Sequence, residues 1–170
     1  MTAGLSIALF SLFFTLAAFA ISANAVPPLI STLAEGFGIG ASNFGFFITL
    51  QFIAFSLASF VGGWIKENRR LTNWHLVSAG LLLITAAFFT GPLLLRSALS
   101  LILWIVPLGL AGGAVETFSS IEISAASDPG SSKNLCLSQV FYSLGAFASP
   151  QLVYLLSLIH ISEPTRLLSI

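Results

Sequence analysis

The chain has 170 residues, of which 56% are hydrophobic and 7% are charged, and its formal net charge is zero. Soluble domains carry about 25% charged residues, so this composition excludes an ordinary soluble domain. Nucleic-acid binding would require a basic patch or stripe, and we therefore expect no nucleic-acid partner. The single cysteine, Cys136, cannot form an internal disulfide.

The ionisable residues lie in short groups that separate five long apolar segments. About 20 apolar residues of helix cross a bilayer core, and a backbone in lipid must satisfy its own hydrogen bonds. We therefore predict an all-α membrane protein in which residues 1–155 form one partial bundle embedded in the lipid bilayer. Its five transmembrane helices are expected at about residues 4–26, 44–65, 74–95, 97–124 and 134–155.

Prolines and small residues mark the expected ends and bends of these helices. Pro27 and Pro28 are expected to end the first helix, and Pro107 and Pro150 to kink the fourth and fifth, because proline lacks the amide hydrogen that a helix needs. Residues 23–25 resemble a signal-peptide cleavage site, but the apolar stretch exceeds a signal core of about 7–15 residues. This length favours a retained membrane helix.

The basic residues are divided unequally between the two ends of the predicted bundle. Lys66, Arg69 and Arg70 follow the second apolar segment. Lys133 precedes the fifth segment at the same end, whereas Arg96 lies at the opposite end. Basic loops tend to remain in the cytoplasm. We therefore expect a cytoplasmic N-terminus in an integral protein of the bacterial inner (cell) membrane.

The C-terminal tail differs from the rest of the chain. The letters of residues 156–166, LSLIHISEPTR, match a translation of a common transposase sequencing adapter. We therefore expect residues 156–170 to be an artefact and the natural part of the sequence to stop near Leu155. The natural part would then be a fragment of a longer membrane protein. The alternative is a genuine helix end that carries a polar tail.

Glu116 is the main candidate for a functional group inside the membrane. An ionisable side chain there costs about 2.5–3.5 kcal/mol on insertion scales and indicates a functional site by default. Gly109 and Gly113 have the four-residue spacing that lets a neighbouring helix approach closely, so we expect Glu116 to face the bundle interior. The alternative is that the fourth helix ends near Val115, but the turn signal at 128–130 favours a longer helix.

Four further polar residues are weaker candidates for a substrate or proton site: Asn24, Gln51, Gln139 and Tyr142. Such residues in membrane helices serve as interhelical hydrogen-bonding groups as often as ligands. The sequence shows no metal-binding spacing, cysteine cluster or phosphate-binding loop. We therefore expect neither an enzyme nor a bound metal or cofactor.

Two segments resemble the major facilitator superfamily, and most closely its fucose–proton symporter branch. In that branch a glycine-rich fourth helix carries Glu-Thr, which residues 109–117 match with Glu116 and Thr117. The fifth helix carries Gln-x-Phe-x-Ser-x-Gly-Ala, which matches the chain from Gln139 to Ala146. The resemblance implies that the chain forms most of the N-terminal six-helix half of a major facilitator fold and lacks the C-terminal half.

The resemblance also implies a function and roles for individual residues. It implies a secondary transporter of a small polar solute, such as a sugar, that works by proton-coupled alternating access. Glu116 would take part in proton coupling or sugar binding, and Gln139 in sugar binding. Asn24 stands where the branch has an acidic residue, and asparagine cannot exchange a proton.

The charged group after the second segment matches the superfamily's cytoplasmic gating loop in position but lacks its Asp-Arg-x-Gly-Arg order. Its members are Lys66, Glu67, Arg69 and Arg70. Two other interpretations remain open. One is an exporter of drugs or metabolites from the same superfamily, in which residues 145–150 would bend the fifth helix. The other is a five-spanning membrane scaffold without transport activity.

Overall fold

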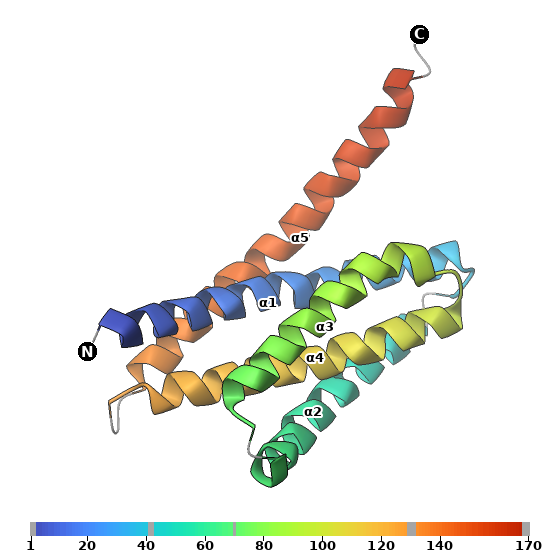
Figure 1. Ribbon diagram of the computed structural model, residues 1–170. Coiled ribbons are helices and arrows are strands. Elements are labelled where there is room, and N and C mark those ends of the chain that lie inside the picture. The colour runs from blue at the N-terminus through green and yellow to red at the C-terminus, as the bar shows by residue number, and fades with distance from the viewer. Residues whose placement is uncertain (1–2, 41–42, 70, 129–131, 168–170) are drawn as a thin grey trace.

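The described residues of the protein form a bundle of five α-helices, shown by a computed structural model (Figure 1). The structure describes residues 3–40, 43–69, 71–128 and 132–167, with side chains over 7–30, 36–40, 43–67, 71–91, 93–128 and 132–155. All regular structure in these residues is helical, which confirms the predicted all-α class. The helices are α1 (Ala3–Gly36), α2 (Phe44–Arg69), α3 (Asn73–Leu94), α4 (Ala98–Ala125) and α5 (Lys133–Leu167).

Within the described part of the chain, four helices are long and apolar enough to span a membrane. The candidate spans are Ile7–Ile30, Phe44–Glu67, Asn73–Gly91 and Ala98–Ala125, consistent with an integral membrane protein. The predicted fifth helix is present, but the described part of α5 is not among these spans. Its serines and its Gln139, Tyr142 and Gln151 make it less apolar than the other four helices.

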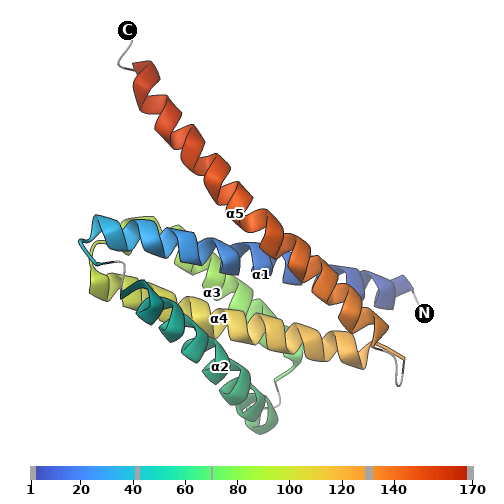
Figure 2. The ribbon, with the colours of Figure 1, turned by 180° about the vertical axis from the view of Figure 1, so that it is seen from behind.

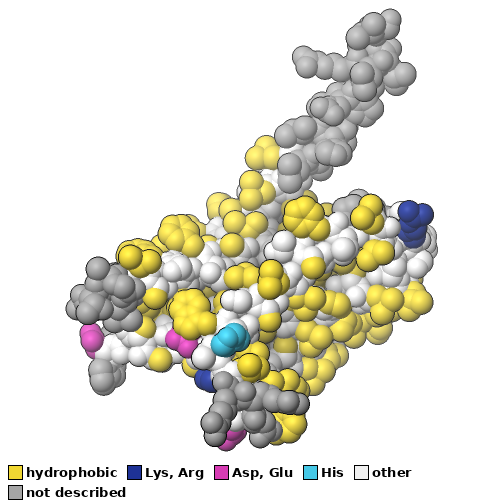
Figure 3. All heavy atoms as spheres, viewed as in Figure 1, with side chains coloured by type: hydrophobic (Ala, Val, Ile, Leu, Met, Phe, Trp, Pro, Cys, Tyr) yellow, Lys and Arg dark blue, Asp and Glu magenta, His cyan; other side chains and the backbone are white. Residues whose placement is uncertain are grey.

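The surface of the bundle suits contact with lipid. Phe60, Phe89 and Phe147 are 82%, 79% and 75% exposed, which would be unfavourable in water. Figure 3 shows charged side chains near the ends of the bundle, while hydrophobic and uncharged groups cover the face between them. This distribution is the one that a bilayer requires, with polar groups at two interfaces and apolar groups between them.

The prediction that Pro27 and Pro28 end the first helix was wrong. Both prolines lie inside α1, which continues to Gly36. Proline removes a backbone hydrogen bond but does not forbid helical dihedral angles, and membrane helices tolerate it where neighbouring groups compensate. The loop that joins α1 to α2 is therefore much shorter than the sequence predicted.

Most of the residues that were predicted to form the gating loop lie in a helix instead. α2 was expected to end near residue 65, but it extends through Lys66 and Glu67 to Arg69. Lysine, glutamate and arginine are good helix formers, so their charge alone does not end a helix. Lys66 is half-buried and Glu67 is exposed, whereas Arg70 and the side chain of Arg69 lie outside the described residues.

α4 is the central helix of the bundle. It packs against α2 on one side and α3 on another, while α1 pairs with α5 (Figures 1 and 2). Apolar side chains of α4 form the core, among them the fully buried Leu101, Ile105 and Val115. Because α4 extends to Ala125, Glu116 lies well inside the helix, which confirms the longer of the two predicted helices.

The predicted close approach at Gly109 and Gly113 is confirmed, and the neighbouring helix is α2. A Cβ atom at Gly109 would overlap the carbonyl oxygen of Gln51, and one at Gly113 would overlap that of Phe55. One turn further on, the Thr117 hydroxyl donates to Ser59 Oγ at 2.7 Å. Residues 109, 113 and 117 thus form a seam of small and hydroxyl side chains that fixes α2 against α4.

A second seam joins α1 to α5. A Cβ atom at Gly145 would overlap the carbonyl oxygen of Ala17, so only glycine allows this approach. One turn later, the hydroxyl group of the buried Ser149 donates a hydrogen bond to the Ile21 carbonyl oxygen at 2.6 Å. These contacts hold the middle of α5 on α1, and the C-terminal part of α5 then extends away from the other helices (Figure 2).

Replacing Ser149 by alanine is expected to loosen this seam. Interhelical hydrogen bonds in membranes contribute about 0.6 kcal/mol on average and up to about 1.7 kcal/mol, and the Ile21 carbonyl oxygen would lose this donor. Unfolding of the purified protein in mixed micelles should show a loss of about 1 kcal/mol. Ser143→Ala is the matched control, because the hydroxyl of the exposed Ser143 donates to the Gln139 carbonyl oxygen of the same helix; an equal loss in both variants would contradict the prediction.

Candidate functional site

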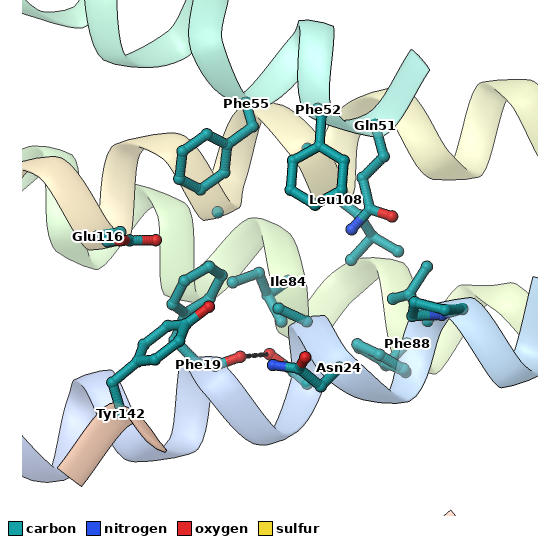
Figure 4. A pocket seen from close by; sticks show the side chains of 16 residues that line it. Phe19, Asn24, Gln51, Phe52, Phe55, Ile84, Phe88, Leu108, Glu116 and Tyr142 are labelled. Atoms are coloured by element: carbon teal, nitrogen blue, oxygen red, sulfur yellow. Dashed lines mark hydrogen bonds between the residues drawn. The ribbon is translucent and has the colours of Figure 1, made fainter. Parts of the chain in front are cut away.

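All five helices line one cavity of about 330 Å³ near the centre of the bundle (Figure 4). Its size falls in the range of small-molecule sites, which are mostly apolar with a few placed polar groups. The polar side chains come from α1, α2, α4 and α5. Four of the five residues predicted as substrate or proton candidates line it: Asn24, Gln51, Glu116 and Tyr142.

The seam between α4 and α2 positions Glu116 at this cavity. Because Gly109 and Gly113 face α2, the neighbouring face of α4, which carries Gly112 and Glu116, is directed to the cavity. A Cβ atom at Gly112 would lie 2.9 Å from the Phe19 ring, so glycine leaves room for that ring beside the carboxylate. Glu116 is half-buried, and the predicted inward orientation is confirmed.

Asn24 and Tyr142 complete a polar group with Glu116. Asn24 Nδ2 donates to the Ala20 carbonyl oxygen at 2.8 Å, which fixes the orientation of its amide. Tyr142 lies on α5 and lines the same cavity as Asn24 and Glu116. The helix faces therefore bring together residues that are far apart in the sequence.

The two prolines of α1 add backbone acceptors to this wall. Pro27 and Pro28 have no amide hydrogen for the carbonyl oxygens of Ala23 and Asn24, four residues earlier. Ala23, Asn24 and Pro27 all line the cavity. The carbonyl oxygens of two residues on this wall therefore lack the amide donor that a regular helix would supply.

Sequence reasoning missed the aromatic part of the site. Four phenylalanine rings from three helices line the cavity together with Tyr142: Phe19, Phe52, Phe55 and Phe88. Phe52 and Phe55 follow Gln51 by one and four positions, so a helical projection from Gln51 would have placed Phe55 near its face. With 16 phenylalanines in the chain, composition alone could not separate these rings from lipid-facing ones.

Gln139 does not reach this cavity. It is exposed and lines a separate shallow pocket with Ser143, whereas Tyr142 faces the cavity. Gln139 and Ser143, four residues apart, thus share one face of α5, and Tyr142 lies on another. Positions 139 and 142 differ by about 60° around a helix of 3.6 residues per turn, which is enough to place them on different surfaces.

A second, more open groove begins at Glu116 and follows α4 toward its C-terminal end. Glu116 and Phe55 line both the cavity and this groove, which continues past the hydroxyl groups of Ser120 and Ser124. Near the same end, Asn73 Nδ2 at the start of α3 donates to Glu122 Oε1 at 2.7 Å. Glu116 is therefore accessible from two directions, whereas Glu122 holds helices together.

Comparisons of the chain with known protein families, with characterised proteins and with solved structures gave no match. Within the described residues, no group of three or more His, Cys, Asp or Glu side chains is placed to hold a metal ion. The functional assignment therefore depends on the cavity and its residues.

Proposed function

We propose that the chain is part of a secondary active transporter of the major facilitator type, which moves a small polar solute such as a sugar. The observation that carries the proposal is the position of Glu116, a membrane-embedded carboxyl group facing a solute-sized cavity lined by all five helices. An ionisable group at such a depth indicates a substrate or proton pathway. The proposed location is the bacterial inner membrane, with the N-terminus in the cytoplasm.

The chemistry of the cavity wall supports a solute with hydroxyl groups and an apolar face. As a carboxylate, Glu116 accepts hydrogen bonds from solute hydroxyls, and after protonation it can donate one. Asn24, Gln51 and Tyr142 provide further hydrogen-bonding groups on the opposite walls. The phenylalanine rings provide the flat apolar surfaces on which the C–H face of a sugar ring can pack.

The exposure of Glu116 to both the cavity and the groove supports a proposal of alternating access. In the proposed carrier, two six-helix halves rock around a site at the middle of the membrane, and this chain contributes five helices of one half. The cavity and the groove meet at Glu116 and Phe55, so the carboxyl group could release its proton on the side opposite to uptake. Gln139 would contact the solute if the second half covered the exposed face of α5.

Replacing Glu116 by glutamine in the full-length transporter is expected to uncouple transport from the proton gradient. Glutamine retains the shape and hydrogen-bonding capacity of the side chain but cannot exchange a proton. Sugar accumulation by proteoliposomes under an imposed pH gradient should fall at least about tenfold, because one lost coupling interaction of about 1.4 kcal/mol corresponds to a factor of ten.

The matched control is Glu122→Gln, which removes the same charge from the same helix outside the cavity. Both variants should retain the helical content of the parent protein. Unchanged gradient-driven accumulation in Glu116→Gln would contradict the role of Glu116 in coupling.

A further inference from the structure

A separate apolar groove of about 330 Å³ lies between α3 and α4, and it shares no residue with the cavity around Glu116. Its rim is exposed, with Leu94 and Leu103 at 63% and 66%, and its floor is formed by Ala87 and Trp104 at 7% and 8%. The Trp104 indole nitrogen donates to the Ala87 carbonyl oxygen at 2.8 Å. The floor is therefore an apolar surface whose indole donor is already bonded within the protein.

The length of the groove matches one leaflet of a bilayer. On α3 it extends from Leu83 to Leu94, and eleven helical steps of 1.5 Å correspond to about 16 Å. The hydrocarbon core of a bilayer is about 30 Å thick, so one leaflet provides about 15 Å. Because α3 and α4 both belong to the candidate spans, the natural occupant of such a groove is an acyl chain.

A positive charge lies at the polar end of the groove. Leu94 and Ser100 line this end, and the Arg96 backbone amide donates to Ser100 Oγ at 2.9 Å. The Arg96 side chain is exposed at the turn between α3 and α4, and Figure 3 shows a basic side chain at this end of the bundle. Arg96 lies outside the candidate spans Asn73–Gly91 and Ala98–Ala125, where headgroups are expected and a guanidinium group can bind a phosphate in a bidentate manner.

We propose that this groove binds an anionic phospholipid, with one acyl chain on Trp104 between α3 and α4 and the phosphate on Arg96. The leaflet-length groove selects an acyl chain, and the cationic end selects a headgroup with a net negative charge over a zwitterionic one. This proposal depends on the chain being embedded in a membrane, and it does not depend on transport activity.

Quenching of Trp104 fluorescence by brominated lipids tests the proposal directly. Trp64 and Trp74 are replaced by phenylalanine, so Trp104 is the remaining tryptophan. The full chain is placed in nanodiscs that contain increasing fractions of phosphatidylglycerol or phosphatidylcholine with dibrominated acyl chains. Phosphatidylglycerol should reach half-maximal quenching at a mole fraction several-fold lower than phosphatidylcholine does.

Arg96→Gln should abolish this preference, and Lys66→Gln, which removes a positive charge from the opposite end of the bundle, should preserve it. Ala86→Leu, at an exposed position that lines the groove, should reduce quenching by both lipids because the added side chain occupies the path of the acyl chain. Equal quenching by the two lipids in the parent protein would overturn the headgroup assignment. Unchanged quenching in Ala86→Leu would overturn the acyl-chain assignment.

Discussion

Replacing Gly113 by leucine is expected to destabilise the bundle by about 3 kcal/mol, at the upper end of the usual cost of overpacking. Even a Cβ atom at this position would overlap the Phe55 carbonyl oxygen, and it would lie 3.1 Å from the Ala58 Cβ. Because backbone atoms cannot rotate away as a side chain can, α2 must move off α4. The hydrogen bond between Thr117 and Ser59 would lengthen with it.

Gly63→Leu is the matched control, because Gly63 also lies inside a helix but a Cβ atom added there would meet no neighbouring atom within 4 Å. This control should unfold in mixed micelles within about 0.5 kcal/mol of the parent protein, as surface substitutions generally do. If Gly113→Leu and Gly63→Leu lost equal stability, the seam between α2 and α4 would not be a determinant of the fold.

The class of fold could be predicted from the sequence because lipid imposes strong local rules. The absence of charge over long segments defined where α2, α3 and α4 lie, and the spacing of Gly109 and Gly113 identified a packing face. The end of α1 was not predictable from Pro27 and Pro28. Whether a proline ends a membrane helix or lies within it depends on the helices around it, which local sequence does not specify.

The candidate site was predicted only where a residue is unusual for its environment. Glu116 stood out because a carboxyl group is costly in a membrane, and its inward orientation followed from the neighbouring glycines. Phe55 and Phe88 are ordinary membrane residues, and their place in the cavity depends on how α2 and α3 are rotated about their axes. The position of Gln139 outside the cavity has the same cause, since the rotation of α5 is set by its seam with α1.

Introducing phenylalanine at Ala23 is expected to block the cavity and to weaken solute affinity in the full-length transporter about 100-fold. Ala23 lines the cavity beside Asn24 on α1, so a benzyl group there would exclude the solute from the polar wall. Losing two or three hydrogen bonds at about 1 kcal/mol each gives about 2–3 kcal/mol, and each 1.4 kcal/mol is a factor of ten.

Ala18→Phe provides the same change on the exposed face of the same helix, where the added ring meets lipid, and its solute affinity should equal that of the parent protein. Affinity is measured as the half-saturating sugar concentration for exchange without a pH gradient, so the result does not depend on proton coupling. A block at Ala23 combined with normal coupling in Glu116→Gln would retain the cavity as the solute site and exclude Glu116 as the proton carrier. Normal affinity in a folded Ala23→Phe variant would instead show that the solute binds elsewhere.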